Sequence, residues 1–532
     1  MTSGVLRELS DSTVPMRPGK REQTMTRVHI EFQRVQTWLF AVPRLRAMVG
    51  ANTLLGEVLR VRLPALAREG SEWRLGASTN AYPGAIAEDP LADHDDPVAD
   101  ARDGILSRDG GHFEATFETG ALAFAQAAGA MLRRELPGLR FRVSVGDVMQ
   151  DTASVDLSTE LPVLAPCEWT GRGLASVAVR QGTERASVSL DVSRRHEAAR
   201  RVEGGSAHDL ASLLVATTAL KGLPRAGSFQ ELAGPGYLAL IHADGNGVGS
   251  AAGSADRERA AFFHRNRVLL RRALRVAIDA GCAAAASAPL VPLMLGGDDV
   301  LVVCRADAAI PFVVSLCDEL TRLQENDGAG FKLTLGVGVV FARPTIPIHR
   351  LHEVAERLAA SAKRRYRGFV DDDERRSVVD WAVYTTAWVD EPEEVRRRDW
   401  LRGTGDDARV LSQRPVDVLG EGVATLQGLH AAATKLDGAP RSQLRYLVEQ
   451  LPKGRTLSDL AFAELSKETQ GRLEAIGVDR VWRETESGPS VTPLLDLVEV
   501  YEMGRLGRAG TVDAIEAPLV ELEDGEALHA QA

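Results

Sequence analysis

Two short stretches of the sequence carry acidic residues in surroundings that suit chemistry. Asp244 directly follows the apolar segment YLALIHA and precedes small residues, in the stretch HADGNGVG. Asp298 and Asp299 end the stretch GGDD, which lies between the apolar segments LVPLML and VLVVC. Each apolar segment predicts a buried strand, so the acids are expected where strands end or turn. These three carboxylates are the first candidates for catalytic residues.

The elements around these acids predict how they are positioned. A strand over 237–243 is followed by a helix over about 255–287, two strands joined by GGDD, a helix over 308–325, a strand over 332–342 and a helix over 347–366. This β-α-β-β-α-β order is that of a ferredoxin-like palm. Because the first and third strands are the central pair of such a sheet, we expect Asp244 to lie beside the 298–299 turn.

Three carboxylates that converge repel one another, which raises the pKa of at least one of them. A divalent cation removes the conflict, and Mg²⁺ or Mn²⁺ prefers hard oxygen ligands. Asp244, Asp298 and Asp299 are therefore predicted to be both metal ligands and catalytic residues. Two such ions could activate an attacking ribose hydroxyl and neutralise the charge of a leaving pyrophosphate. The predicted reaction is attack on the α-phosphorus of a nucleoside triphosphate.

The glycines beside the acids are expected to serve the same site. Positive φ angles and space for a substrate against bare backbone are predicted for Gly296 and Gly297 and, after Asp244, for Gly245, Gly247 and Gly249. Backbone N–H groups after Asp244 could face phosphates. A GGDD stretch by itself is also a reasonable solvated hairpin turn. Its combination with Asp244, on an apolar strand in the correct order, favours the functional interpretation.

The remaining chain is divided by its patterning. The fold class predicted is α+β, with two ferredoxin-like palms, a linker subdomain and a C-terminal helical domain. The predicted parts are a disordered leader (1–26), a catalytically silent first palm (27–150), a linker subdomain (151–230), the second palm with the GGDD site (231–395), the helical domain (396–510) and an acidic tail (511–532). Helices are expected at about 408–434, 440–450, 456–476 and 491–507.

Composition sets limits on function. A net charge of −11 argues against a protein that coats nucleic acid with its whole surface. The Arg-rich stretches 194–201 and 265–275 are expected to be solvated helix faces. Four cysteines without a CxxC pair predict free thiols in a reducing compartment. No apolar stretch is long enough to span a membrane. A cytoplasmic protein without a membrane partner is expected.

The quoted motifs resemble a known family. HADGNGVG, LMLGGDDVLVV and the segment from Lys332 to Lys363 are similar to the active palm of the large subunit of type III CRISPR effector complexes, which is related to the GGDEF diguanylate cyclases. The stretch IEFQRVQTWLFAVPRLRAMVGANTLL resembles the first palm of that family. The resemblance implies a synthase that converts ATP into cyclic oligoadenylate messengers in antiviral defence. It also implies partners, namely other effector subunits with guide RNA and target RNA.

The resemblance carries roles to particular residues. Asp298 and Asp299 match the GGDD pair, Asp244 the first acid of a D-x-D-x-x-G motif and Gly249 its glycine. Lys363 matches a lysine that reaches a triphosphate in the cyclases. Arg367 lies one helical turn later on the same face and could join it, although a solvated lysine at 363 is an equal alternative.

Several family features are altered in this sequence. The second acid of D-x-D is Asn246, so a metal contact there would be weaker or would come from the backbone. Cys167 stands where a CxxC of a zinc module would begin, but Thr170 replaces the partner, so no zinc is expected. No HD nuclease domain is expected, and His208-Asp209 and His94-Asp95 are interpreted as coincidental. The first palm lacks acids at its strand end, so its role would be to support the active palm or to receive the second nucleotide.

Two alternatives remain open. The first is a diguanylate-cyclase-like enzyme that uses GTP; against it, the fourth motif position is Asp299 rather than Glu, and the chain holds a second palm. The other is a catalytically inactive scaffold of a CRISPR complex, which the retention of all three carboxylates disfavours.

Overall fold

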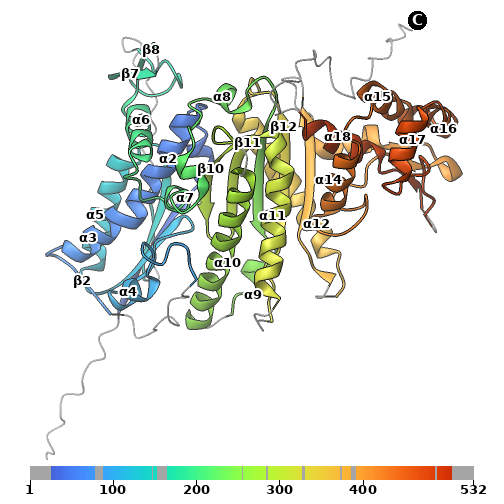
Figure 1. Cartoon of the computed structure of the whole chain (residues 1–532). Coiled ribbons are helices and arrows are strands. Elements are labelled where there is room, and N and C mark those ends of the chain that lie inside the picture. Colours follow the sequence, from blue (N-terminus) through green and yellow to red (C-terminus); the bar gives the residue numbers. More distant parts are fainter. Residues whose placement is uncertain are drawn as a thin grey trace, which may run out of the picture.

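The computed structural model shows two β-sheets side by side, with a group of helices beyond the second sheet (Figure 1). It describes residues 25–77, 88–146, 148–152, 165–181, 183–253, 256–282, 285–325, 330–371, 374–384, 391–485 and 488–505. The predicted acidic tail and nearly all of the predicted leader lie outside these residues. None of the described helices is long and apolar enough to cross a membrane.

The first sheet is built around strand β1 (Thr26–Gln33), which lies between β4 (His112–Thr119) and β5 (Arg140–Val145), antiparallel to both. Shorter strands extend it: β2 (Arg74–Leu75), β3 (Ile105–Ser107) and β6 (Val148–Thr152). Its helices are α1 (Val35–Leu39), α2 (Leu45–Glu57), α3 (Leu63–Glu69), α4 (Pro97–Arg102) and α5 (Ala121–Glu135), with a π-helical turn η1 (Val58–Arg62) joining α2 to α3. The alternating burial of β4 confirms the strand predicted from HFEATFE.

The segment after the first sheet packs against it. It contains the hairpin β7 (Val177–Gln181) and β8 (Glu184–Val188), helices α6 (Leu190–Glu203), α7 (Leu210–Val215) and α8 (Phe229–Ala233), and a 3₁₀ turn η2 (Ala219–Gly222). Helix α6 crosses α2 so closely that a Cβ at Gly50 would lie 1.7 Å from the carbonyl oxygen of Arg195. Arg195 is fully buried, donates to Asp191 (3.1 Å) and stacks on Trp38. The expectation that 194–201 is a solvated face is therefore wrong at this residue, because a carboxylate and an aromatic ring replace water around its guanidinium.

The second sheet has the order β10-β11-β9-β12-β13-β16. Its strands are β9 (Leu238–Gly245), β10 (Leu290–Gly296), β11 (Asp299–Arg305), β12 (Leu335–Ala342), β13 (Val378–Tyr384) and β16 (Val416–Asp417). Its helices are α9 (Val248–Ala251), α10 (Asp256–Cys282), α11 (Ala306–Gln324) and α12 (Ile348–Arg367). The first four strands in chain order, β9, β10, β11 and β12, occupy positions three, one, two and four of the sheet, as a ferredoxin-like palm requires. The predicted α+β architecture of two palms with helical parts is confirmed.

Both faces of the second sheet are covered, and strand alternation divides them. On β9, Ala239, Ile241 and Ala243 join the core that contains α10 and α11. Leu238 and Leu240 point the other way, into a core shared with α12 and with the first sheet. Since side chains alternate, Asp244 belongs to the face turned toward α12 and the first palm. The catalytic candidates therefore lie where the two palms meet.

The C-terminal part contains helices and very short strands. The helices are α13 (Pro392–Val395), α14 (Leu426–Lys435), α15 (Arg441–Gln450), α16 (Arg455–Ala463), α17 (Lys467–Glu474) and α18 (Leu494–Met503), with turns η4 (Arg396–Trp400), η5 (Gly405–Asp407) and η6 (Leu451–Lys453). Strands β14 (Leu401–Arg402), β15 (Arg409–Val410) and β17 (Ser490–Val491) form a small sheet. The helix predicted over 408–434 begins only at Leu426, because residues 409–410 and 416–417 pair as strands β15 and β16.

A buried group of ion pairs fastens the two palms together. Arg271 of α10 donates to Asp89 (2.8 Å) and to Asp95 (2.6 Å), which precede the first sheet's β3. Arg60 of η1 contacts both Asp95 (3.4 Å) and Asp109 (3.0 Å). Burial alone would raise the pKa of Asp95, but the surrounding arginines hold it well below its usual range. The expectation that 265–275 is a solvated helix face is therefore wrong at Arg271, which is buried between the two palms.

Replacing Arg271 by Ala should therefore destabilise the protein by about 3–5 kcal/mol, because two buried carboxylates lose their partner. Arg275→Ala, at an exposed position of the same helix, should change the unfolding free energy by less than about 0.5 kcal/mol. Chemical denaturation monitored by tryptophan fluorescence measures both. Equal effects of the two substitutions would contradict this view of the interface.

Candidate active site

Strand pairing brings the three acids together. In the antiparallel pair of β11 and β9, Asp299 lies directly opposite Asp244, which corresponds to Cα atoms about 4.5–5.5 Å apart. Asp298 lies in the turn before β11, and its carbonyl oxygen accepts a hydrogen bond of 3.2 Å from the N–H of Gly245. The expected proximity of the two stretches is confirmed.

The hairpin that carries Asp298 depends on one glycine. Gly296 pairs with Asp299, which leaves Gly297 and Asp298 as the two turn residues. Gly297 has a φ of +60°, as the first position of a type II′ turn requires. Gly296 lies in the strand and is not among the residues with positive φ, so only half of the predicted pair adopts that conformation.

The glycines after Asp244 differ in what they do. Gly247 has a φ of +67° and precedes the four-residue helix α9. At Gly245 an added Cβ would lie 2.7 Å from Oδ2 of Asp298 and 2.6 Å from Val248. Gly249 has free space around its Cα, and neither it nor Gly245 has positive φ. Gly245 is therefore needed because a larger residue would block the approach of Asp298. The sequence predicts that Gly245 leaves room for a substrate, whereas in the structure it leaves room for the Asp298 side chain.

The acids perturb one another electrostatically. Burial, and then the negative charges of Asp244 and Asp299, raise the pKa of Asp298 to about 6. Lys363 of α12 forms an ion pair with Asp244. His242, two residues before Asp244 on the same face of β9, lies 2.8 Å from Oδ1 of Asp299. Burial opposes charge on this imidazole, but the hydrogen bond and charge of Asp299 raise its pKa overall.

The first palm contributes directly to this site. Gln36 of α1 donates to Oδ2 of Asp299 at 3.3 Å. The residue before the helix, Arg34, has a φ of +53° and is the one described non-glycine residue with positive φ, a strained conformation that persists only where its surroundings fix it. The turn after β1 is therefore shaped to reach across the interface to the second palm.

The other predicted binding residues are placed differently. Asn246 is buried just beyond β9, and its amide donates to Thr334 (3.1 Å), the residue before β12, while its Oδ1 has no hydrogen-bond partner among the described residues. Lys363 is held at Asp244 as described above. Arg367 is the last residue of α12 and is exposed. Its predicted action together with Lys363 remains a prediction.

A cleft of about 1150 Å³ lies between the two palms. The second palm contributes Gly296, Gly297, Asp298 and Asp299, and the first palm contributes residues of β1 and β4 such as His29 and His112. The volume exceeds the range of about 300–1000 Å³ usual for a site that takes one small molecule. Asp298 and Asp299 thus line the cleft, whereas Asp244, opposite Asp299 on β9, and Lys363 and Arg367 are not among its lining residues.

Sequence reasoning missed two residues that touch the acids. His242 could have been found, because side chains two apart on a strand share a face and Asp244 was already a candidate. Gln36 could not, because the contact depends on how two separate sheets pack. The donor set as a whole suits a divalent cation, because it consists of carboxylate oxygens, and the three carboxylates outnumber the single lysine, Lys363, that pairs with one of them.

Comparison with known proteins identifies the domain that carries the site. Residues 237–369 match the family model of the Cas10/Cmr2 second palm domain. This segment includes Asp244, Asp298, Asp299 and Lys363. The match confirms the resemblance that the motifs of this segment indicate. No curated protein matches the sequence.

Among the solved structures that this chain resembles are structures of Csm1, alone or together with Csm4. The Csm1–Csm4 cassette in complex with AMPPNP is 14% identical (TM-score 0.37), and the match covers 65% of this chain and 54% of that one. The cassette in complex with cA4 is 13% identical (TM-score 0.45; 91% and 70% covered), and Csm1 in T. onnurineus is 14% identical (TM-score 0.44; 91% and 70% covered). Likenesses this distant carry no inference about activity.

The raised pKa of Asp298 gives a prediction about stability. An acid whose pKa is about 6 in the folded protein and about 3.9 when unfolded destabilises the fold once pH rises through this range. Asp298→Asn should therefore raise the melting temperature at pH 8 and leave it unchanged at pH 4, in the absence of divalent ions.

The matched control is Asp318→Asn, at an exposed position on α11, which should show no such pH dependence. Added Mg²⁺ should stabilise the wild type at pH 8 more than Asp298→Asn. A constant difference between wild type and Asp298→Asn from pH 4 to pH 8 would show that the acids do not interact as described.

Proposed function

Because the second palm of this chain is a Cas10/Cmr2 palm domain, we propose that the chain is a metal-dependent nucleotidyl cyclase that makes cyclic oligoadenylates from ATP. Its proposed setting is the large-subunit position of a type III CRISPR effector complex or a related antiviral system. The observation that carries the proposal is the register of β9 and β11, which sets Asp244 opposite Asp299 with Asp298 in the adjoining turn.

The proposed metal ligands are Asp298, Asp299 and Asp244. A bound Mg²⁺ or Mn²⁺ would polarise the α-phosphate and promote ionisation of the attacking ribose hydroxyl. The protein's part is to hold the carboxylates in place: Gln36 and His242 each contact one oxygen of Asp299. Lys363 offsets the charge of Asp244. It is also the proposed contact for a triphosphate, since its amine lies at the same strand end.

The cleft supplies a place for more than one nucleotide. Two of its cations, Arg34 and Arg259, are exposed and form no ion pair within the described residues. They are therefore available for phosphate oxygens. The first palm, which has no acid at the end of β1, would receive the second nucleotide against β1 and β4. This fits a reaction that joins two nucleotides better than one that closes a ring within a single nucleotide.

Other effector subunits, guide RNA and target RNA are the proposed partners and activators. None of the described contacts favours the alternative of a diguanylate-cyclase-like enzyme, because none of them distinguishes guanine from adenine in the substrate. The inactive scaffold is disfavoured by the intact acid geometry, because a mere interaction surface has no need for three acids brought together at one strand end.

The deciding experiment is incubation of the purified chain with Mg²⁺ or Mn²⁺ and with labelled ATP or GTP, with and without co-expressed partner subunits, followed by mass analysis of the products. Cyclic oligoadenylates from ATP are expected, and Asp298→Ala/Asp299→Ala should abolish them. Products from GTP alone would favour the diguanylate alternative. Equal behaviour of this variant and the wild type with every nucleotide would favour the scaffold.

Two glycines near Asp244 give a matched pair of variants. Gly245→Ala places a methyl group 2.7 Å from Asp298, so the acid must move, and product formation should fall at least tenfold, since displacements of about 1 Å can cost about 100-fold. Gly249→Ala adds a methyl group in open space and should retain nearly full activity. Loss of activity in both, or in neither, would contradict the proposed role of Asp298.

A further inference from the structure

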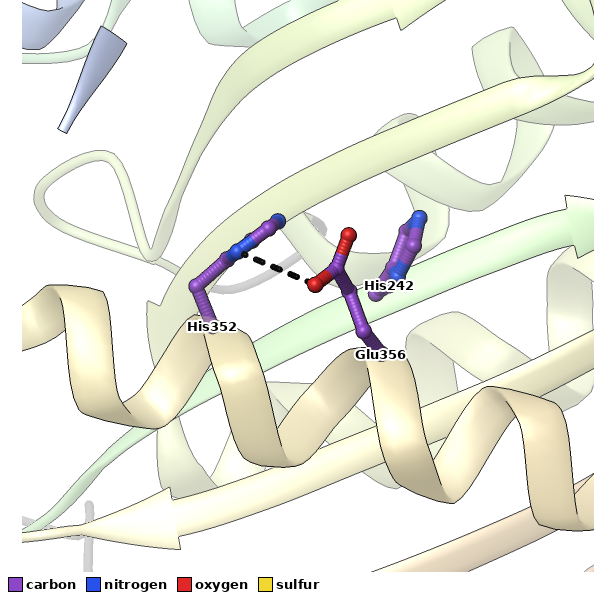
Figure 2. A group of neighbouring side chains, drawn as sticks. All are labelled: His242, His352 and Glu356. Carbon is purple, nitrogen blue, oxygen red and sulfur yellow. Dashed lines mark ion pairs between the residues drawn. The ribbon is translucent and has the colours of Figure 1, made fainter. Parts of the chain in front are cut away.

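Behind the acids, three side chains from two elements converge on one point. His242 of β9, His352 of α12 and Glu356 of α12 each offer one ligand atom, and these atoms all lie within 4.8 Å of one another. Figure 2 shows the glutamate and the two imidazoles turned toward the space between helix and strand. His352 and Glu356 are four residues apart, so they share a face of the helix, with 3.8 Å between His352 Nδ1 and Glu356 Oε2.

Both imidazoles are buried with unused nitrogen atoms. His242 Nδ1 and His352 Nε2 have no hydrogen-bond partner among the described residues, and both side chains are more than nine-tenths buried. A buried polar atom without a partner costs free energy. Two buried imidazoles that each keep an unpartnered nitrogen, and that lie beside one carboxylate, are explained if a ligand binds among them.

The surroundings are those of a metal-binding imidazole. In the neutral form of His242 whose Nε2 donates to Asp299 at 2.8 Å, the Nδ1 atom carries the lone pair and can bind a metal ion. Metal-ligating histidines usually donate their second N–H to a carboxylate in this way. On the other side, Phe40 covers His352 with ring centroids 4.6 Å apart. The Glu356 side chain is 44% exposed, which leaves a path for an ion and for water ligands.

We propose that His242, His352 and Glu356 bind a divalent transition-metal ion, of the Zn²⁺ or Co²⁺ kind, distinct from the ions held by the three acids. Two imidazoles and one carboxylate are ligands for such ions and not for Mg²⁺. Ligand atoms around a tetrahedral Zn²⁺ lie roughly 3.3 Å apart, so the three side chains, whose ligand atoms lie within 4.8 Å of one another, need to draw closer by at most about 1.5 Å (4.8 minus 3.3). The cysteine-based zinc module considered from the sequence involves a different segment.

The ion would act on the neighbouring site through one residue. Bound at His242 Nδ1, it fixes the tautomer that donates to Asp299 and so fixes the orientation of that carboxylate. His242 and His352 thereby become positioning residues for Asp299. This inference does not depend on which nucleotide the second palm uses.

The test is metal binding by the full chain after removal of bound metal with a chelator. Co²⁺ is added while the visible absorption of nitrogen-ligated Co²⁺ is followed, and Zn²⁺ binding is measured by calorimetry. The variant Asp244→Asn/Asp298→Asn serves as the background, so that metal ions bound by the three acids do not contribute to the signal. One Zn²⁺ or Co²⁺ per chain is expected in this background.

Glu356→Gln and His352→Gln should each weaken binding at least tenfold. Their controls lie on the same helix: Glu353→Gln, whose side chain is 46% exposed, and His349→Gln, which is exposed, should change it less than twofold. If His352→Gln fails to fold, the Glu356→Gln and Glu353→Gln pair decides alone. No binding in the background chain, or equal weakening by Glu356→Gln and Glu353→Gln, overturns the proposal and leaves adventitious binding only.

Discussion

Repulsion among three carboxylates at one end of a sheet is the constraint around which this structure is organised. The register of β9 and β11 puts Asp244 and Asp299 face to face, and the turn adds Asp298. Burial of Asp298, together with the charges of Asp244 and Asp299, raises the pKa of this acid. Lys363, His242 and Gln36 each contact one of the acids and hold it in place, but only Lys363 brings a permanent positive charge. The remaining charge leaves the site suited to a divalent cation.

The position of the acids follows from how the second sheet is buried. One face of β9 packs on α10 and α11, and the other faces α12 and the first palm. His242 and Asp244 share the second face, so the functional groups lie against a protein surface and not in open solvent. Gln36 of the first palm therefore contacts Asp299 in the site, and the buried ion pairs of Arg271 hold the two palms together.

Most of the site's framework could be predicted from the sequence, because it depends on element order. The apolar strands around Asp244 and GGDD are unambiguous, and the palm order alone makes them neighbours. What could not be predicted depends on contacts between elements. The steric role of Gly245 involves the side chain of Asp298. The burial of Arg271 requires carboxylates from a distant segment, and the burial of Arg195 requires the distant ring of Trp38. The prediction of a helix from residue 408 was wrong because strands of two residues show no periodicity in the sequence. The prediction of a positive φ at Gly296 was wrong because this residue pairs with Asp299 in the strand and is not part of the turn. His352 and Glu356 show helical spacing, but nothing in the sequence pairs them with His242.

The most direct test of the central claim is a structure of the protein with Mn²⁺ and a non-hydrolysable ATP analogue, with Mn²⁺ located by its anomalous scattering. The account predicts Mn²⁺ in contact with Asp298 and with Asp244 or Asp299, at metal–oxygen distances of about 2.1–2.2 Å, with triphosphate oxygens completing its coordination. A triphosphate bound elsewhere, with no ion between these carboxylates, would contradict it.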